Sequence, residues 1–217
     1  MKRYFFIVMA LMVLVSCKKD RISGSGEIIT ETRNVANFYN VSVSGSSNVS
    51  ITRGDNFEVK VKAYENIVPY LETKIQDGTL LIAFKNNSNI SNDNSEVFIT
   101  MPSLNSVATS GSGNITSTGA FLGSGNFKAS TSGSGNISID GGSADNLQVN
   151  VYGSGSVKSF GFVAQQTVVN IEGSGNAEIT VIQNLNATIS GSGNVYYKGN
   201  PATINSKITG SGQVIKQ

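Results

Sequence analysis

The tripeptide Gly-Ser-Gly recurs at nearly constant spacing through the second half of this sequence, and this repeat constrains the fold more than any other feature. The copies lie 18–22 residues apart, and the next residue is Asn in most of them. A fixed period near 20 residues is the signature of a stacked repeat architecture. The copies begin at Gly111, Gly133, Gly153, Gly173, Gly191 and Gly210, with fourth residues Asn114, Asn136, Ser156, Asn176, Asn194 and Gln213.

The segments that flank the tripeptide alternate between apolar and polar residues. Val149-Asn150-Val151-Tyr152 precedes one copy, and Ile137-Ser138-Ile139 follows another. This period of two indicates half-buried strands. Residues 102–217 contain no sustained helical period.

Together these features predict a parallel β-helix with coils of about 20 residues and Gly-Ser-Gly-Asn corners. Glycine reaches positive φ without a Cβ clash, and Asn tolerates the left-handed conformation. Coils stack about 4.8 Å apart, so equivalent Asn side chains are expected to form an amide ladder. A further copy at Gly123, followed by Asn126, predicts two such corners per coil. An antiparallel β-sandwich with glycine turns is the alternative all-β fold.

Residues 34–101 lack the regular repeat, and we interpret them as N-terminal coils with irregular insertions. Strands are expected at 38–43, 49–52, 57–63, 79–84 and 97–101, with one helical turn around Pro69 and a flexible loop over 86–95. Residues 102–217 are expected to form the regular repeats of the same domain.

The N-terminus has the features of an export signal. Lys2 and Arg3 precede an apolar run over residues 5–15, which is too short to span a bilayer. The run ends in Ser16-Cys17 and resembles a bacterial lipobox, in which the Cys receives a diacylglycerol. We expect residues 1–16 to be a lipoprotein signal peptide, Cys17 to be the lipid-attachment site and residues 17–33 to include a tether. The expected location is the outer membrane, facing either the cell surface or the periplasm. The alternative is an ordinary signal peptide with an incidental Cys.

The composition of the chain argues against several functional classes. Beyond residue 16 the basic and acidic residues balance at 14 each, which argues against nucleic acid as a partner. The sequence has no His, which excludes Ser-His catalysis and His-containing metal sites. We predict no catalytic residues, no metal site and no cofactor. The acidic glycine loop at 140–145 could bind one calcium ion, but an ordinary turn is the expected structure.

An enzyme acting on polysaccharide is an alternative, because many β-helices are lyases or hydrolases. Glycoside hydrolysis usually needs two carboxylates that face one bond. After residue 102 the acidic residues are few, and they do not fall in one repeating column. They are Asp140, Asp145, Glu172 and Glu178.

The residues that directly precede the glycine motif are mostly hydroxylic. If the coils stack, these residues line one outward column, which could bind a glycan or an extended protein, or could only keep the solenoid soluble. Tyr196 and Tyr197 lie near the end of the repeat. The column comprises Ser110, Ser132, Tyr152, Glu172, Ser190 and Thr209.

The chain resembles the family described as "putative auto-transporter adhesin, head GIN domain" over roughly residues 35–215. The resemblance rests on 38–45 (Phe-Tyr-Asn-Val-Ser-Val-Ser-Gly), 77–82 (Asp-Gly-Thr-Leu-Leu-Ile), 101–104 (Met-Pro-Ser-Leu) and the serial Ser-Gly-Ser-Gly-Asn copies. It implies a right-handed β-helix in an exported, adhesion-related protein, and it carries over no catalytic residues.

We therefore expect a non-enzymatic binding or structural module of the cell envelope, attached to the membrane by its lipid. A scaffold without external ligand is a further alternative. The last coil shows no obvious cap, so weak end-to-end or edge-to-edge self-association is expected, with Lys207, Lys216 and Gln217 guarding the edge.

Overall fold

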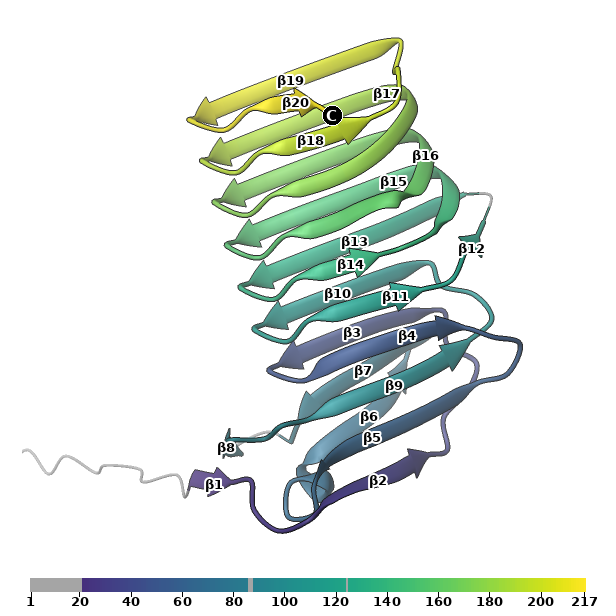
Figure 1. Ribbon diagram of the computed structural model, residues 1–217, viewed down its shortest axis with the longest axis vertical. Helices are drawn as coiled ribbons and strands as arrows, with labels where there is room; N and C mark the ends of the chain where they lie inside the picture. Colours follow the sequence, from purple (N-terminus) through teal and green to yellow (C-terminus); the bar gives the residue numbers. More distant parts are fainter. Residues whose placement is uncertain (1–20, 86–87, 124) are drawn as a thin grey trace, which may run out of the picture.

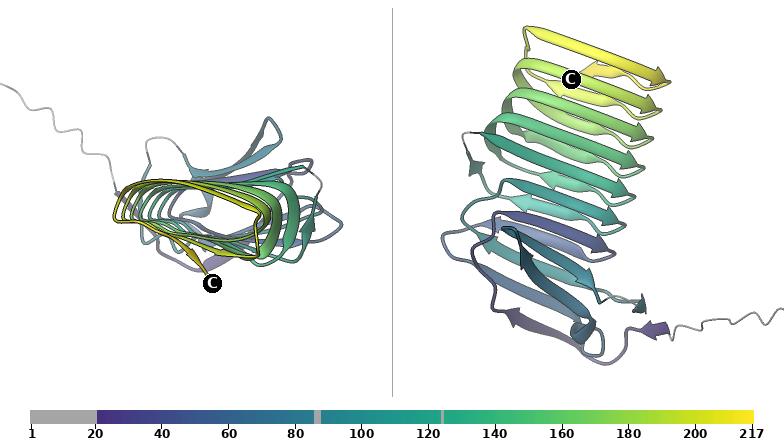
Figure 2. Two further views of the ribbon diagram at one scale, coloured as in Figure 1. Left: turned by 90° about the horizontal axis from the view of Figure 1, so that it is seen from above. Right: turned by 180° about the vertical axis from the view of Figure 1, so that it is seen from behind.

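The computed structural model describes residues 21–85, 88–123 and 125–217, which form a flattened right-handed solenoid of about six turns (Figures 1 and 2). Residues 1–20, which include the expected signal peptide and Cys17, lie outside the described residues. The predicted parallel β-helix is confirmed, and the β-sandwich alternative is wrong, because all strand pairs of the repeat region are parallel.

The N-terminal third contains nine strands and one 3-10 turn. They are β1 (Arg21–Ser23), β2 (Ile28–Arg33), β3 (Asn40–Gly45), β4 (Asn48–Arg53), β5 (Glu58–Tyr64), η1 (Val68–Tyr70), β6 (Leu71–Gln76), β7 (Thr79–Phe84), β8 (Asn89–Ser91) and β9 (Glu96–Met101). The turn η1 confirms the prediction around Pro69. The described part of the range expected to be a tether forms β1 and β2. The expected loop over 86–95 contains β8, which pairs with β1.

The repeat region contains the remaining strands. They are β10 (Ser106–Gly111), β11 (Ile115–Thr118), β12 (Phe121–Leu122), β13 (Asn126–Gly133), β14 (Ile137–Ile139), β15 (Gly142–Gly153), β16 (Val157–Gly173), β17 (Ala177–Gly191), β18 (Val195–Lys198), β19 (Thr203–Gly210) and β20 (Val214–Lys216).

Each coil crosses two sheets. Strands β3, β10, β13, β15 and β19, with the C-terminal halves of β16 and β17, form the long-strand sheet. Strands β4, β11, β14, β18 and β20, with the N-terminal ends of β16 and β17, form the short-strand sheet. Strands β16 and β17 bend from one sheet to the other, and their pairing register shifts between Ser159 and Gln166 at this bend.

The glycine corners stack directly on one another. In the six copies from Gly111 to Gly210 that recur once per coil, the first glycine has positive φ, for example 113° at Gly153 and 127° at Gly173. The third glycine does not, but a Cβ at Gly155 would lie within 3.0 Å of the Gly135 carbonyl oxygen of the preceding coil. The first glycine is therefore needed both for its backbone conformation and for space, because a Cβ at Gly153 would also meet the Gly133 carbonyl oxygen, whereas the third glycine is needed for space alone.

The second corner of each coil lies at the opposite end and is less regular. At the Gly123 copy the described chain passes from β12, which ends at Leu122, to β13, which begins at Asn126. Later coils instead turn through the acidic glycine loop at 140–145 or through the bends of β16 and β17. The prediction of two glycine corners is thus correct for this coil only.

The fourth residues of the motif form the predicted ladder on the surface. The Asn114 side-chain oxygen accepts hydrogen bonds from the Asn136 backbone N–H (2.9 Å) and from its Nδ2 (3.1 Å). The Asn194 backbone N–H likewise donates to Asn176 Oδ1 at 2.9 Å. At Ser156 the hydroxyl takes over as acceptor, receiving the Asn176 N–H at 3.1 Å. Each rung thus binds a backbone group that the turn leaves unpaired.

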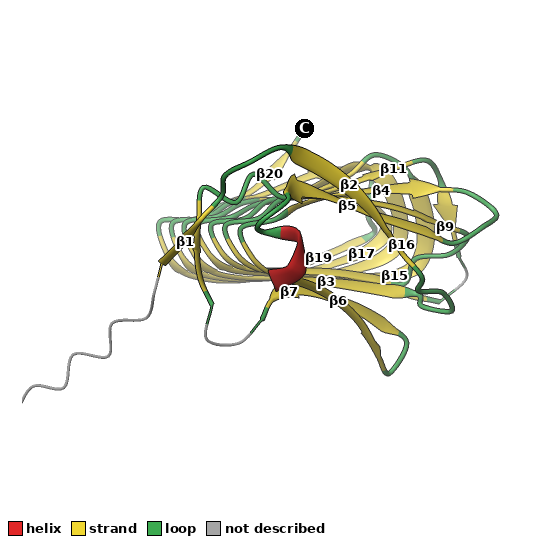
Figure 3. Cartoon of the chain, turned by 90° about the horizontal axis from the view of Figure 1, so that it is seen from below, coloured by secondary structure: helices red, strands yellow, loops and turns green. Residues whose placement is uncertain are grey.

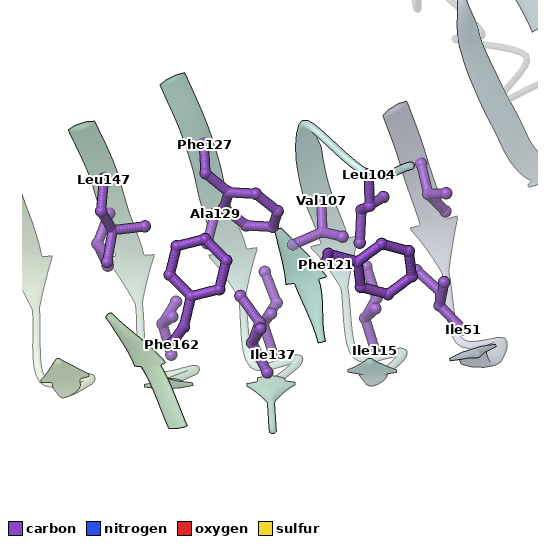
Figure 4. Close-up of a cluster of buried hydrophobic side chains, with 14 of the residues drawn as sticks. Ile51, Leu104, Val107, Ile115, Phe121, Phe127, Ala129, Ile137, Leu147 and Phe162 are labelled. Atoms are coloured by element: carbon purple, nitrogen blue, oxygen red, sulfur yellow. The ribbon is translucent and has the colours of Figure 1, made fainter. Parts of the chain in front are cut away.

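The space between the two sheets is filled by one continuous apolar core, part of which Figure 4 shows. Phe127 and Phe162 approach with ring centroids 4.6 Å apart. Several buried hydroxyls interrupt the apolar lining. Two of them, on Thr109 and Thr131, donate to the Gly113 and Gly135 carbonyls at 2.8 and 2.6 Å. At these two corners the buried hydroxyl groups are therefore hydrogen-bonded.

The two ends of the solenoid differ. At the N-terminal end, antiparallel strands β2 and β5 and the turn η1 lie across the opening (Figure 3). Beneath them Ala63, Ile67 and Val68 form a second buried cluster. At the C-terminal end all eight residues of β19 are exposed.

Alanine substitutions separate the two roles of glycine. Gly155→Ala should lower the free energy of unfolding by about 2–3 kcal/mol through the steric clash. Gly125 has φ of 123° and nothing within 4 Å of the position that a Cβ would take, and as Ala it should lose about 1–2 kcal/mol. Gly123→Ala, with ordinary φ and open space, is the matched control and should change stability by less than about 0.5 kcal/mol. Urea unfolding measures all three, and equal losses would contradict the assignment.

Completing the ladder should stabilise the domain. In Ser156→Asn the new side chain can accept the Asn176 N–H and donate to Asn136 Oδ1, a gain of about 0.5–1 kcal/mol. Ser154→Asn places the same amide at an exposed position of the same corner, off the ladder, and serves as the control. A thermal melt of Ser156→Asn at or below that of the control would refute the role of the ladder.

Candidate binding surface

The outer face of the long-strand sheet carries its side chains in straight columns. Because the strands pair in register, the residues that precede each glycine motif align as predicted: Ser110 pairs with Ser132, Ser132 with Tyr152 and Tyr152 with Glu172. The column continues through Ser190 to Thr209, and all six side chains are exposed. The predicted hydroxyl-rich outward column is therefore confirmed as a structural feature.

A second feature of this face was not predicted. Nearer the start of the long strands lies a groove of about 500 Å³, and six of its ten lining residues carry side-chain amides. We call it the amide groove. Its lining consists of Asn105, Asn126, Phe127, Lys128, Asn146, Leu147, Gln148, Gln166, Val168 and Asn186.

Two groups of amides in this region differ in their bonding. Some are linked along the solenoid axis: Asn146 Nδ2 donates to Asn126 Oδ1 at 3.1 Å, and Asn205 Nδ2 donates to Asn186 Oδ1 at 3.0 Å. Gln148 and Gln166 are exposed, and within the described chain their side chains make no hydrogen bond. The groove thus combines amides held in place with amides free to bind.

The amide groove is nearly uncharged, and its lining exposes apolar atoms as well as side-chain amides. Lys128 is its one ionisable residue. Of its apolar residues, Phe127 and Leu147 are buried, and Val168 is 42% exposed. In the hydroxyl column of the same face, Tyr152 presents a ring that is 42% exposed. Amides both donate and accept hydrogen bonds, so the surface can bind hydroxyl groups from several directions.

A second long-strand ladder lies between the groove and the hydroxyl column. Asn170 Nδ2 donates to Asn150 Oδ1 at 3.0 Å, and Asn150 Nδ2 donates to Ser130 Oγ at 3.2 Å. These bonds fix the side chains in the middle of the face. The amide groove and the hydroxyl column are therefore the two parts of the face that can engage a partner.

The structure does not gather the acidic residues considered for catalysis. Glu172 points outward from the long-strand sheet, in register with Tyr152 and Ser190. Glu178 lies on the other sheet, in register with Lys158 and Tyr196. Across residues 21–85, 88–123 and 125–217, no group of three or more His, Cys, Asp or Glu could hold a metal ion.

The remaining residues singled out in the sequence lie apart from this surface. Asp140 and Asp145 flank the far corner of one coil, where Ser138 Oγ lies 3.4 Å from an Asp140 carboxylate oxygen. Tyr196 is half-buried on the short-strand sheet, and Tyr197 points into the core with 9% exposure. Neither tyrosine belongs to the long-strand face.

A larger hollow of about 690 Å³ lies at the N-terminal end, between the segments 32–36 and 55–58. Its guanidinium group is already occupied: Arg33 forms an ion pair with Glu31 at 2.8 Å and donates to the carbonyls of Val68 (3.1 Å) and Leu71 (3.3 Å). These bonds hold η1 against β2. Arg33 in this hollow therefore serves to hold two elements together. The amide groove is the stronger candidate for a binding site.

The fold and this face define a right-handed β-helix with polar outer columns, and comparison with known proteins agrees. The family model described as "putative auto-transporter adhesin, head GIN domain" matches residues 37–201. The chain belongs to this family. Comparison with curated proteins gave no significant match. Among the described residues, no helix is long and apolar enough to cross a membrane.

Solved structures share the fold over nearly the whole chain. A putative adhesin from Bacteroides fragilis is 19% identical, with a TM-score of 0.75 over 90% of this chain and 100% of that one. A putative adhesin from Parabacteroides merdae is 23% identical, with a TM-score of 0.59 over 91% and 99%. A protein described as a putative lipid binding protein, from Parabacteroides distasonis, is 25% identical, with a TM-score of 0.58 over 91% and 100%.

Proposed function

We propose that this chain is a non-enzymatic binding module of the cell envelope, and that the long-strand face binds a glycan. The observation that carries the proposal is the amide groove. Its lining offers donors and acceptors at a coil spacing of about 4.8 Å, with almost no charge. A hydroxyl-rich chain offers matching groups. Membership in an adhesin family supports a role at the cell surface or envelope.

Affinity on such a face arises from repetition. An open groove contributes few buried contacts, so each sugar unit binds weakly. A chain that crosses several coils makes the same contact repeatedly, and the later contacts form at high effective concentration. A long polysaccharide therefore fits the surface better than a short oligosaccharide.

An enzyme that acts on polysaccharide is less well supported. Glu172 and Glu178 are on opposite sheets, and the amide groove contains no carboxylate. Glycoside hydrolysis by the usual route needs two carboxylates around one bond. The groove is built to hold hydroxyl groups and has no acid to protonate a leaving group.

Removal of the two free amides tests the glycan proposal. The variant Gln148→Ala/Gln166→Ala should bind a soluble polysaccharide about tenfold more weakly, because each lost hydrogen bond is worth about 0.5–1.5 kcal/mol. Calorimetry against a neutral dextran and an acidic alginate provides the measurement. Gln165→Ala/Gln183→Ala removes two exposed amides outside the groove and should leave binding unchanged.

Two results would argue against a glycan site. One is equal binding by both double variants. The other is binding to phospholipid vesicles alone, which would favour the activity that the description of the Parabacteroides distasonis neighbour names. The six amides of the lining lead us to expect binding to polysaccharide in preference to vesicles.

We further propose that Cys17 carries the lipid that anchors the chain to the outer membrane. The proposal rests on the apolar run before Ser16-Cys17 and on the single Cys of the chain. Two or more acyl chains make attachment stable. Cys17→Ala should therefore shift the protein from the membrane fraction to the soluble fraction of lysed cells. Ser16→Ala, next to it, is the control and should stay in the membrane fraction.

A further inference from the structure

The C-terminal end of the solenoid presents both a free strand edge and open core. Strand β19 pairs with β17 on one side, and no described strand lies on its other side. Its inward residues Ile204 and Ile208 are 43% and 41% exposed, whereas their equivalents in the previous coil, Leu185 and Ile189, are fully buried. Unpaired edges of this kind are templates for another strand.

The N-terminal end of another copy does not fit this surface. The turn η1 and the cluster of Ala63, Ile67 and Val68 fill the middle of that end. The hairpin of β6 and β7 projects sideways from it (Figure 3). Head-to-tail stacking would therefore place the exposed apolar residues of the C-terminal end against an N-terminal surface that is already covered and uneven.

The C-terminal end of a second copy does fit. We propose that two chains dock tail to tail, with β19 of one copy antiparallel to β19 of the other about a two-fold axis. An axis perpendicular to the long-strand sheet places the two long-strand sheets on one side and the two short-strand sheets on the other. Both cores then become continuous. Isologous two-fold contacts are the commonest form of self-association.

The residues of β19 select one register. Side chains in a strand alternate between faces, so inward residues must meet inward residues. Centring the axis on Ser206 sets Ile204 opposite the second copy's Ile208 and Ile208 opposite its Ile204. On the outer face it sets Lys207 opposite Asn205.

The neighbouring registers pair the inward residues less well. With the axis on Asn205, Ile204 meets Ser206 and the isoleucines no longer pair. With the axis on Lys207, Ile204 meets Gly210 and two lysines stand directly opposite each other, which is destabilising. The register centred on Ser206 is therefore the one that pairs both isoleucines and separates the charges.

This geometry has a consequence that rests on the proposed lipid anchor at Cys17. In a tail-to-tail pair the two N-terminal ends point away from each other, since β1 and β2 lie at the opposite end of the solenoid from β19 and β20 (Figure 1). Two anchored chains paired in this way would join two membranes. The contact would then be homotypic adhesion, separate from glycan binding on the side face.

Sedimentation and crosslinking test the docking in full-length protein carrying Cys17→Ser, which removes the only native thiol. Sedimentation should show a reversible monomer–dimer equilibrium. In Ile204→Lys/Ile208→Lys the dissociation constant should rise at least tenfold. Both positions are already exposed, so the variant should fold, and circular dichroism checks that it does. Exposed Ile28→Lys/Ile29→Lys on β2 is the control and should dimerise normally.

A cysteine scan determines the register. Ser206→Cys should form a disulfide-linked dimer on oxidation, because the two residues face each other across the axis. Asn205→Cys or Lys207→Cys alone should not, but a mixture of the two variants should crosslink. A monomer at all concentrations, or crosslinking by Asn205→Cys or Lys207→Cys alone, would overturn the proposal.

Failure of this proposal can be told apart from failure of the glycan proposal. Gln148→Ala/Gln166→Ala should dimerise normally, and Ile204→Lys/Ile208→Lys should still bind polysaccharide. Beads that carry the protein by its N-terminus should cluster, while beads that carry it by its C-terminus should not. Dimers in solution without orientation-dependent clustering would refute the bridging of two membranes.

Discussion

The close approach of successive backbones at the glycine corner is the contact on which the structure depends. At Gly135, Gly155 and Gly175 a side chain of any size would meet the carbonyl oxygen of the preceding coil. Parallel strands can pair along a whole sheet only if the turns between them stack with the same spacing of about 4.8 Å. The glycines lose more conformational entropy on folding than other residues, and each coil from Gly113 onward has one at this position because a larger residue would clash with the preceding coil.

Stacking in register has a chemical result, because it converts a sequence repeat into columns of like side chains. Inside, the columns form one apolar core. At the corner, the Asn ladder ties each coil to the next through a backbone N–H and a side-chain amide. On the long-strand face, the same register brings amides from separate coils into one groove. The candidate binding surface is thus a by-product of the stacking that stabilises the fold.

The regular features of this molecule could be predicted from sequence, because the repeat itself reports them. The period gives the coil length, the alternation at Val149–Tyr152 gives the strand faces, and the recurrent Asn gives the ladder. The column from Ser110 to Thr209 follows from aligning the corners. The amide groove was missed, although Asn126, Asn146 and Gln166 recur at the coil period; their signal was available in the alternating polar positions before the motif.

Other features could not be predicted, because they depend on non-repeating contacts. The far corner varies in length, and the register shift between Ser159 and Gln166 has no marker in the sequence. The antiparallel pairs of β5 with β2 and β9 join segments by long-range packing. The sequence repeat reports only the contacts that neighbouring coils share. The segments that cover the N-terminal end do not repeat, so the period could not reveal them.

The two ends of the solenoid differ because one is built from non-repeating segments and the other continues the repeat. A solenoid exposes core wherever stacking stops, and an end must be covered by other structure or remain adhesive. The N-terminal end departs from the repeat and gains strands that run against it, together with η1. The last coil keeps the repeat pattern through Gly210 and leaves Ile204 and Ile208 open to solvent. A side face of fixed polar columns and an end with unsatisfied strand pairing are different kinds of binding surface. In the proposed functions the first would recognise chemistry that repeats along a ligand, and the second would recognise a strand edge of matching register.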